Sequence, residues 1–331
     1  MLKSDNLQHI THIKKTLTFC VLAVVWSMMI DAQTRNGITV LRYAPEYVGT
    51  VDIAATRYTY KQALEGFSQW LEESKLTTVT GDTIRLYKSF LVDKKCLGPK
   101  TVSTYLSGIR GYFNYCIKQG LISEDPTKGI KNPKLNRGHS REAMTIEEAK
   151  VFLSAIDRST LLGKRDYAMI YLMLKCGLRE IEIIRSNIED LRPKDGAMVL
   201  YIQGKAWAGK NDFVVIVKQV NEAMQDYLQA RGKVTYRDPL FASVGNRSKG
   251  RLTTRAIRER VNYYLNKSGV KRRTITTHSL RHTAATMALE AGAPIFEVKQ
   301  MLRHVRIETT MIYLHEYNRV KNGAEHYIKQ I

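Results

Sequence analysis

The residues best suited to phosphate chemistry lie in the last sixth of the chain, from Thr277 to His315. His278 and Arg281 are three positions apart, so on a helix they share one face. Near a helix N-terminus, their donors would add to free backbone N–H groups and to the positive end of the helix dipole. Tyr313 then offers a phenolic oxygen that could attack a bound phosphate. The stretch therefore predicts a site that binds a phosphate ester and reacts with it.

A second set of charged residues lies roughly 70 to 100 positions earlier. Arg179 follows Gly177, which is predicted to cap a buried helix, and this is an unusual place for an arginine that only faces solvent. Arg179 and Glu182 could also form a plain surface ion pair. Lys205 and Lys210 flank the tip of a predicted hairpin, where lysines most often only improve solubility. The second set gains a chemical meaning only if the fold places it beside the first.

The charge of the chain favours a polyanionic partner. Its 52 lysines and arginines outnumber its 31 acids and give a net charge of +21. Nucleic acid is the commonest such partner and a membrane surface the second, while a generally basic protein is the alternative. Residues 247–273 hold ten basic residues and one acid, Glu259, which favours a surface that binds duplex DNA. The candidate DNA contacts are Arg251, Arg255, Arg258, Lys271, Arg272 and Arg273.

Neither the cysteines nor the histidines predict a metal site. The four cysteines are widely spaced and form no CxxC pair, which indicates buried or incidental thiols in a reducing compartment. His278 and His282 are one helical turn apart and could suggest zinc, but no nearby acid or cysteine completes a ligand set. We therefore expect no metal and no cofactor, and we expect His282 to be a core residue or a support for the site.

The N-terminal extension, residues 1–44, contains an apolar run at 17–30. Fourteen residues are too few for a membrane span, which needs about 20. The run and the preceding Lys14 and Lys15 resemble a signal peptide, although Asp31 follows where a small-residue cleavage site would be needed. A helix packed on the body and a non-native upstream extension are the two other interpretations, and the sequence does not separate them.

Helical periodicity dominates residues 45–125, which we predict to be a small all-α domain. Apolar residues recur at helical spacing around 60–71, over 82–94 and over 101–119, and Ile117 is among those expected to face inward. Residues 126–142 follow as a basic linker rich in proline and glycine. This linker could be a solvated connector, could lie along a phosphate backbone, or could do both.

A second domain is predicted over residues 143–331. It opens with a capping box at 145–148, and a nearly all-apolar helix around 167–174 is expected at its centre. Two β-type runs at 198–203 and 213–217 form a hairpin. A basic helix is expected over 254–267, with Ile257, Val261, Tyr264 and Leu265 on its buried face. The predicted fold class is mainly α with a small antiparallel β-sheet, and the chain ends in a tail helix.

At 177–182 and 278–282 the sequence resembles the tyrosine recombinases of the phage integrase family. The segments 302–304 and 313–315 complete the resemblance, which covers roughly residues 45–331, and four motifs in order make it specific. The resemblance implies a helical core-binding domain of the SAM-like type, followed by an α+β catalytic domain. One departure is visible: the family commonly has glycine where this chain has Arg303, and the arginine could alter the turn or contact a phosphate.

The resemblance implies catalytic roles for six residues. Tyr313 is the nucleophile, and Arg179 and Arg281 clamp the scissile phosphate. His278 assists proton transfer and His304 donates a hydrogen bond to the phosphate. Lys205 is the general acid, and Glu182 braces the first arginine.

The resemblance also implies a function. The chain would be a cytoplasmic, site-specific DNA recombinase of a mobile element, joining double-stranded DNA as a tetramer on two sites without metal or ATP. It leaves room for accessory DNA-bending proteins and for a tail helix that docks either on a neighbouring protomer or on its own domain. The alternatives are a DNA-relaxing enzyme like type IB topoisomerases and a DNA-binding regulator with an inactive site.

Overall fold

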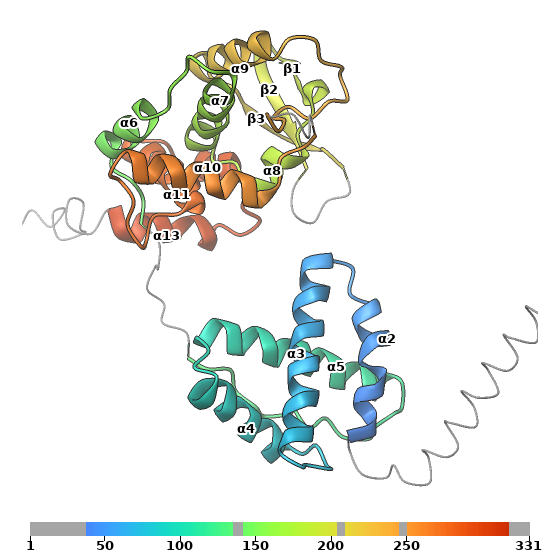
Figure 1. The fold of residues 1–331 in the computed structure, drawn as a ribbon. Coiled ribbons are helices and arrows are strands. Elements are labelled where there is room, and N and C mark those ends of the chain that lie inside the picture. The colour runs from blue at the N-terminus through green and yellow to red at the C-terminus, as the bar shows by residue number, and fades with distance from the viewer. Residues whose placement is uncertain (1–37, 135–141, 204–208, 245–249, 318–331) are drawn as a thin grey trace, which may run out of the picture. The chain divides into compact units, whose positions relative to one another are not determined.

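The computed structural model describes residues 38–134, 142–203, 209–244 and 250–317, and the chain divides into two compact units, residues 1–137 and 138–331 (Figure 1). The apolar segment 17–30, residues 135–141 of the expected linker, Lys205 and the tail after 317 lie outside the described residues. None of the described helices is long and apolar enough to cross a membrane.

The first unit is entirely helical over its described residues. Its elements are η1 (Ile38–Tyr43), α2 (Ala44–Gly49), α3 (Ala54–Glu73), α4 (Gly81–Ser89), the π-helical turn η2 (Phe90–Lys94) and α5 (Pro99–Lys118). The helix predicted over 82–94 is therefore an α-helix that widens into a π-turn.

The core of the first unit lies between α3 and α5. Phe67 of α3 and Phe113 of α5 are both buried there. The inward position expected for Ile117 is wrong: this side chain is 36% exposed, and Cys116 is buried in its place. The buried face of α5 advances from Phe113 by three residues to Cys116, so Ile117 falls just outside it.

The start of the expected linker packs on the first unit. Ile130 is buried in the core of that unit. Arg110 of α5 donates to the Ile130 carbonyl at 3.1 Å, and Lys88 of α4 donates to the Lys131 carbonyl at 2.9 Å. Two long cationic side chains therefore hold this stretch by its backbone.

The second unit combines helices with a three-stranded antiparallel sheet of order β1-β2-β3, so the predicted fold class is confirmed. The elements before the basic stretch are α6 (Ile146–Ser154), α7 (Leu161–Cys176), α8 (Glu180–Arg185), η3 (Ile188–Asp190), β1 (Leu191–Lys194), β2 (Ala197–Ile202), β3 (Asp212–Val215) and α9 (Lys218–Arg231). Those after it are α10 (Thr254–Lys267), α11 (Thr277–Glu290), α12 (Ile295–Leu302) and α13 (Glu308–Tyr317).

Strand β1 and helix α9 were not among the predicted elements. Strand β1 pairs with β2 through a two-residue turn, Asp195-Gly196, and both turn residues have positive φ. Such a turn matches the twist of a hairpin. Pro193 lies within β1, and proline is tolerated there because β1 is an edge strand.

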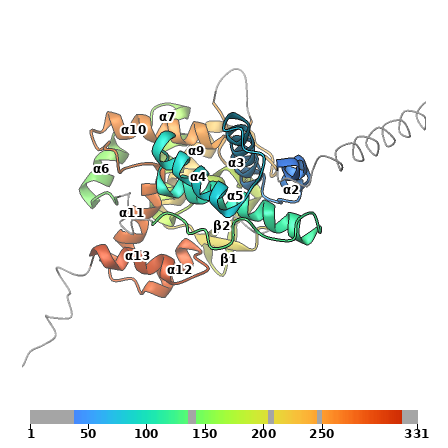
Figure 2. The same cartoon turned by 90° about the horizontal axis from the view of Figure 1, so that it is seen from below.

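Helix α7 forms the centre of the second unit, and the way it ends positions the site. Gly177 caps it in the left-handed conformation, with φ of 59°. A Cβ at this position would lie 2.7 Å from the Leu302 side chain. Glycine therefore allows the turn and also lets the end of α12 approach the residues that follow α7. Helices α11, α12 and α13 lie together (Figure 2), and Arg281 of α11 donates to the carbonyl of Gly177 in this turn.

Candidate active site

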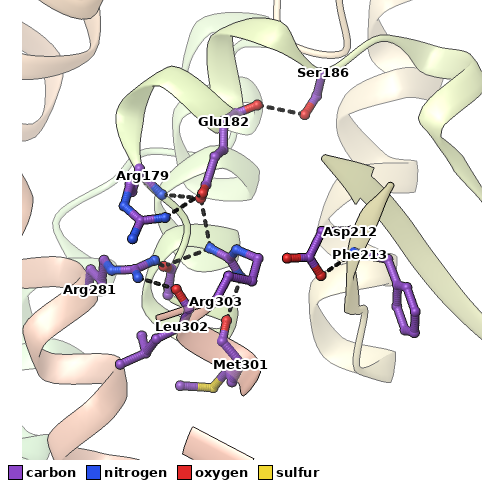
Figure 3. A network of polar contacts seen from close by, with 10 residues as sticks. Arg179, Glu182, Ser186, Asp212, Phe213, Arg281, Met301, Leu302 and Arg303 are labelled. Carbon is purple, nitrogen blue, oxygen red and sulfur yellow. Dashed lines mark hydrogen bonds and ion pairs between the residues drawn. The ribbon is translucent and has the colours of Figure 1, made fainter. Parts of the chain in front are cut away.

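Three segments that are far apart in the sequence meet at the end of α7. They are the turn from α7 into α8, the first half of α11, and the end of α12 with α13. Figure 3 shows side chains of these segments converging, with Arg179, Arg281 and Arg303 arranged around Glu182 and the neighbouring backbone. The three segments carry the motifs that the sequence analysis singled out.

Arg281 ties all three segments together. Its buried guanidinium donates one hydrogen bond to the Gly177 carbonyl and another to the Leu302 carbonyl. Burial, together with the charges of Arg179 and Arg303, lowers the pKa of Arg281 to about 9. The guanidinium therefore still carries its charge at pH 7.

The ion pair between Arg179 and Glu182 is not a plain surface pair. Glu182 Oε1 accepts from Arg179 Nη1 at 2.8 Å, and Glu182 Oε2 accepts from the Arg179 backbone N–H at 2.7 Å. The Glu182 side chain is 0% exposed, whereas that of Arg179 is 29% exposed. A buried carboxylate thus grips both the backbone and the side chain of an arginine that remains partly open to solvent.

Tyr313 is buried between two histidines. Its ring lies edge-on to His282, with ring centroids 4.5 Å apart, and nearly parallel to His304, with centroids 6.3 Å apart. Burial raises the pKa of Tyr313, while the charges of Arg281 and Arg179 lower it by less. The phenol is therefore protonated at pH 7, and an attack by its oxygen requires that a base remove the proton.

His304 is a neutral histidine at pH 7. Its Nδ1 lies 2.9 Å from the hydroxyl of Thr310, which is itself buried. Burial lowers the pKa of His304 to about 4, and the charges of Arg281, Arg179 and Arg303 act in the same direction. A phosphate at this place would oppose the arginine charges, so DNA binding should raise the pKa of His304 again.

The low pKa of His304 predicts how stability depends on pH. Between about pH 6.5 and pH 4 the unfolded chain binds a proton that the folded chain does not, so folding stability falls as the pH falls. We expect the wild type to lose about 1 to 2 kcal/mol more than His304→Gln between pH 7 and pH 4.5. Urea unfolding at the two pH values measures this difference. Equal losses in the two proteins would contradict the assignment of a neutral, buried His304.

The remaining catalytic candidates differ in how the structure places them. His278 is exposed in the first turn of α11, one turn before Arg281, and its charge contributes to the low pKa of His304. Lys205 lies outside the described residues. His282 is buried against Tyr313. Contacts and charges thus connect Arg179, Arg281, His304 and Tyr313 directly.

Several residues predicted to contact DNA form hydrogen bonds or ion pairs within the protein. Arg251 donates to the Ser186 carbonyl at 3.2 Å and to the Asn187 side chain at 2.6 Å. Arg258 lies on α10 as predicted and pairs with Glu180, the first residue of α8, at 2.7 Å. These two arginines therefore tie the basic stretch to the segment that carries Arg179.

Of the other four candidates, two are half-buried and two are exposed. Arg272 pairs with Glu142 at 2.7 Å, and Lys271 donates to the Asn262 side chain at 2.7 Å. The two that are exposed are Arg255, which pairs with Glu259 on the helix surface, and Arg273. None of the six candidates is buried, and at least five of them also contact polar groups of the protein itself.

Arg303 is the functional candidate whose place the sequence analysis missed. It has a left-handed backbone, with φ of 54°, and its guanidinium donates to Glu182 Oε2 at 2.7 Å instead of turning outward. No local pattern could reveal this contact, because 121 positions separate the two residues. Among the described residues, no group of three or more histidines, cysteines or acids is placed to hold a metal ion.

Comparison with protein-family models covers most of the chain. The Phage integrase family matches residues 142–319, and the Phage integrase SAM-like domain matches residues 39–133. The tyrosine recombinase XerC of Chlamydia caviae is 31% identical over 249 residues, which is 75% of this chain and 78% of XerC. XerD of Listeria innocua is 29% identical over 272 residues, which is 79% of this chain and 88% of XerD.

Solved structures share the fold at low sequence identity. The XerH site-specific recombinase in a post-cleavage complex matches with a TM-score of 0.68 at 22% identity, covering 83% of this chain and 80% of XerH. The Tn1549 transposon integrase matches with a TM-score of 0.66 at 17% identity, covering 89% of this chain and 100% of the integrase chain. The first family model alone spans more than half of the sequence. The chain belongs to the phage integrase family of tyrosine recombinases.

Proposed function

We propose that Tyr313 is the nucleophile with which this site-specific DNA recombinase breaks and rejoins DNA strands. Its phenolic oxygen attacks a backbone phosphate, so a bond from Tyr313 Oη to phosphorus forms and the bond to the 5′-oxygen breaks. The products are a 3′-phosphotyrosyl bond and a free 5′-hydroxyl. The 5′-hydroxyl of a second strand reverses the step, and because the phosphotyrosine conserves the bond energy, the reaction needs no ATP.

Two arginines would stabilise the charge of the transition state. Negative charge builds up on the non-bridging oxygens of the phosphate, and a planar guanidinium can bind two of them at once. Arg179 is partly open to solvent, while Arg281 is anchored at the meeting point of three segments. This supports Arg179 as the arginine that meets the phosphate first and Arg281 as the fixed side of the clamp.

The remaining groups would move protons and orient the phosphate. Tyr313 must lose a proton, and His278 on the exposed first turn of α11 is our candidate to assist this transfer. His304 is neutral, and its ring lies nearly parallel to that of Tyr313. It would donate a hydrogen bond to the phosphate. Lys205 would give the leaving 5′-oxygen its proton. His282 would support Tyr313 from its other side.

The proposed partner is double-stranded DNA, bound by a tetramer of this chain on two sites. The net charge of +21 suits a polyanion. Related structures include XerH bound to its difH substrate and the Tn1549 integrase in complex with circular intermediate DNA. Accessory DNA-bending proteins would fit such an assembly. Because the substrate is DNA, we place the reaction in the cytoplasm.

The observation that carries the proposal is the meeting of Arg179, Arg281, His304 and Tyr313 from three distant segments. A DNA-binding regulator would need neither a buried tyrosine nor two arginines held beside it. A relaxing enzyme of the type IB kind would use the same groups on one duplex, so its product distinguishes it.

The test is a plasmid that carries two copies of the DNA ends of the element from which the gene comes. We expect the purified protein to delete or invert the DNA between the two copies. Relaxed plasmid without recombinants would favour the topoisomerase-like alternative. Binding without any strand breakage would favour the regulator.

A further inference from the structure

Arg303 occupies a backbone position that suits glycine. It ends α12 with φ of 54° and ψ of 46°, which is the left-handed region. A residue with a Cβ is strained there, and glycine is not. Members of the family commonly have glycine at this place, as the resemblance implies. An arginine that accepts the strain should make contacts that compensate for it.

The Arg303 side chain makes such contacts inside the protein. It is 5% exposed and donates to Glu182 Oε2 at 2.7 Å and to the Gly177 carbonyl at 3.3 Å. A further hydrogen bond goes to the Met301 carbonyl. The guanidinium thus points toward Glu182 and the neighbouring backbone, as Figure 3 shows, and is not exposed to meet a phosphate.

Glu182 is shared between Arg303 and Arg179. Its Oε2 accepts from Arg303 and from the Arg179 backbone, while its Oε1 accepts from the Arg179 side chain. Burial alone would raise the pKa of Glu182, but the charge of Arg303, followed by the contacts of Arg179, lowers it below its usual value. Arg303 and Arg179 therefore both keep this carboxylate ionised.

The Gly177 carbonyl is shared in the same way. It accepts from Arg303 Nη2 and from Arg281 Nη1. Arg303 consequently contacts one acceptor of each clamping arginine: Glu182 for Arg179 and the Gly177 carbonyl for Arg281.

We propose that Arg303 is a positioning residue for strand cleavage: it fixes Glu182 and the Gly177 carbonyl where these groups hold Arg179 and Arg281 toward the scissile phosphate. Arg303 itself does not touch the DNA. The inference rests on the proposed function, because it presupposes that the two arginines bind the phosphate under attack.

The fork shape of the guanidinium matters as well as its charge. Arg303 reaches three acceptors from two terminal nitrogens, and a lysine has a single nitrogen for the same task. Arg303→Lys should therefore keep Glu182 ionised but position it less well. Arg303→Gly removes the contacts together with the backbone strain, so the relief of strain offsets part of the stability that is lost with the ion pair.

The test measures single-turnover cleavage of a nicked duplex that traps the covalent product. We expect Arg303→Gly to cleave about 10- to 100-fold more slowly than the wild type, since a small misplacement of a clamping group has such an effect. We expect DNA affinity to stay close to the wild-type value, and Arg303→Lys to cleave at an intermediate rate. The melting temperature of Arg303→Gly should fall, because the buried Glu182 carboxylate loses one of its two arginine partners, so cleavage is compared at a temperature where both proteins are folded. Lys218→Met is the matched control, because it removes a cation from an ion pair whose lysine is 85% exposed.

A second substrate tests whether the loss acts through the phosphate. A methylphosphonate at the scissile position removes the charge that the arginines neutralise. The rate difference between wild type and Arg303→Gly should shrink on this substrate, whereas a merely structural defect would leave it unchanged.

The outcomes distinguish a failure of the role proposed for Arg303 from a failure of the proposed function. Cleavage by Arg303→Gly within twofold of the wild type, or an unchanged rate difference on the methylphosphonate, would overturn the inference. If Arg303→Gly does not fold, Arg303→Lys decides: wild-type cleavage by it would count against a role for the fork. A wild type that forms no covalent product would instead overturn the proposed function.

Discussion

Tyr313→Phe is expected to abolish covalent attachment to DNA, with a loss of about 10⁴-fold or more in cleavage rate. Phenylalanine keeps the ring that packs between His282 and His304, and it removes only the attacking oxygen. Folding and DNA affinity should therefore stay close to wild type. Denaturing gels of the protein incubated with labelled nicked DNA measure the attachment, and gel shifts measure the affinity.

Tyr317 provides the matched control for this experiment, because it lies one turn further along α13. We expect Tyr317→Phe to attach to DNA as the wild type does. Attachment that persists in Tyr313→Phe and disappears in Tyr317→Phe would move the nucleophile by one turn and contradict our assignment.

Glu182→Gln is expected to have the largest effect on stability among the changes considered. The substitution leaves the Arg303 guanidinium, which is 5% exposed, without its counter-charge, and Arg179 loses the same partner. Removal of one partner from a buried ion pair costs about 3 to 5 kcal/mol. Because glutamine keeps the shape and one acceptor, we expect a loss of about 2 to 4 kcal/mol in the free energy of unfolding, measured in urea at pH 7.

The pH dependence of this loss has a definite sign. The pKa of Glu182 lies below its usual value in the folded chain, so the carboxylate contributes stability above the unfolded pKa and loses it as the pH falls through the folded pKa. The difference between wild type and Glu182→Gln should therefore be largest near neutral pH and shrink in acid.

Glu259→Gln is the control for Glu182→Gln. Its carboxylate pairs with Arg255 on the helix surface, where both side chains are largely exposed. Such pairs contribute about 0.5 kcal/mol or less. Equal losses in the two variants would show that the Glu182 network carries no special weight.

Helical periodicity and capping motifs correctly predicted helices in the second unit. The helix over 254–267 has the predicted bounds, and its four predicted core residues are buried, because both follow from spacing within one helix. The capping box at 145–148 is also present. Strand β1 and the burial of Cys116 in place of Ile117 were missed, since an edge strand carries little pattern and neighbouring positions share the border of a helix face.

Sequence motifs predicted which residues form the site but not how their side chains contact one another. Arg179, Arg281, His304 and Tyr313 were singled out from their motifs, and the structure brings them together. The inward turn of Arg303 depends on a carboxylate 121 positions away. The contacts of the basic stretch within the protein were not predictable for a related reason: charge in a sequence does not reveal that Arg251 donates to Asn187 or that Arg272 pairs with Glu142.

The most direct test of the whole account identifies the atom that is joined to DNA. Wild-type protein is trapped on a nicked duplex, digested with a protease, and the peptide that carries DNA is sequenced by mass spectrometry. We predict a phosphotyrosine at Tyr313, linked to the 3′ end of the broken strand. A link to the 5′ end, a link through another residue, or the absence of any linked peptide would contradict it.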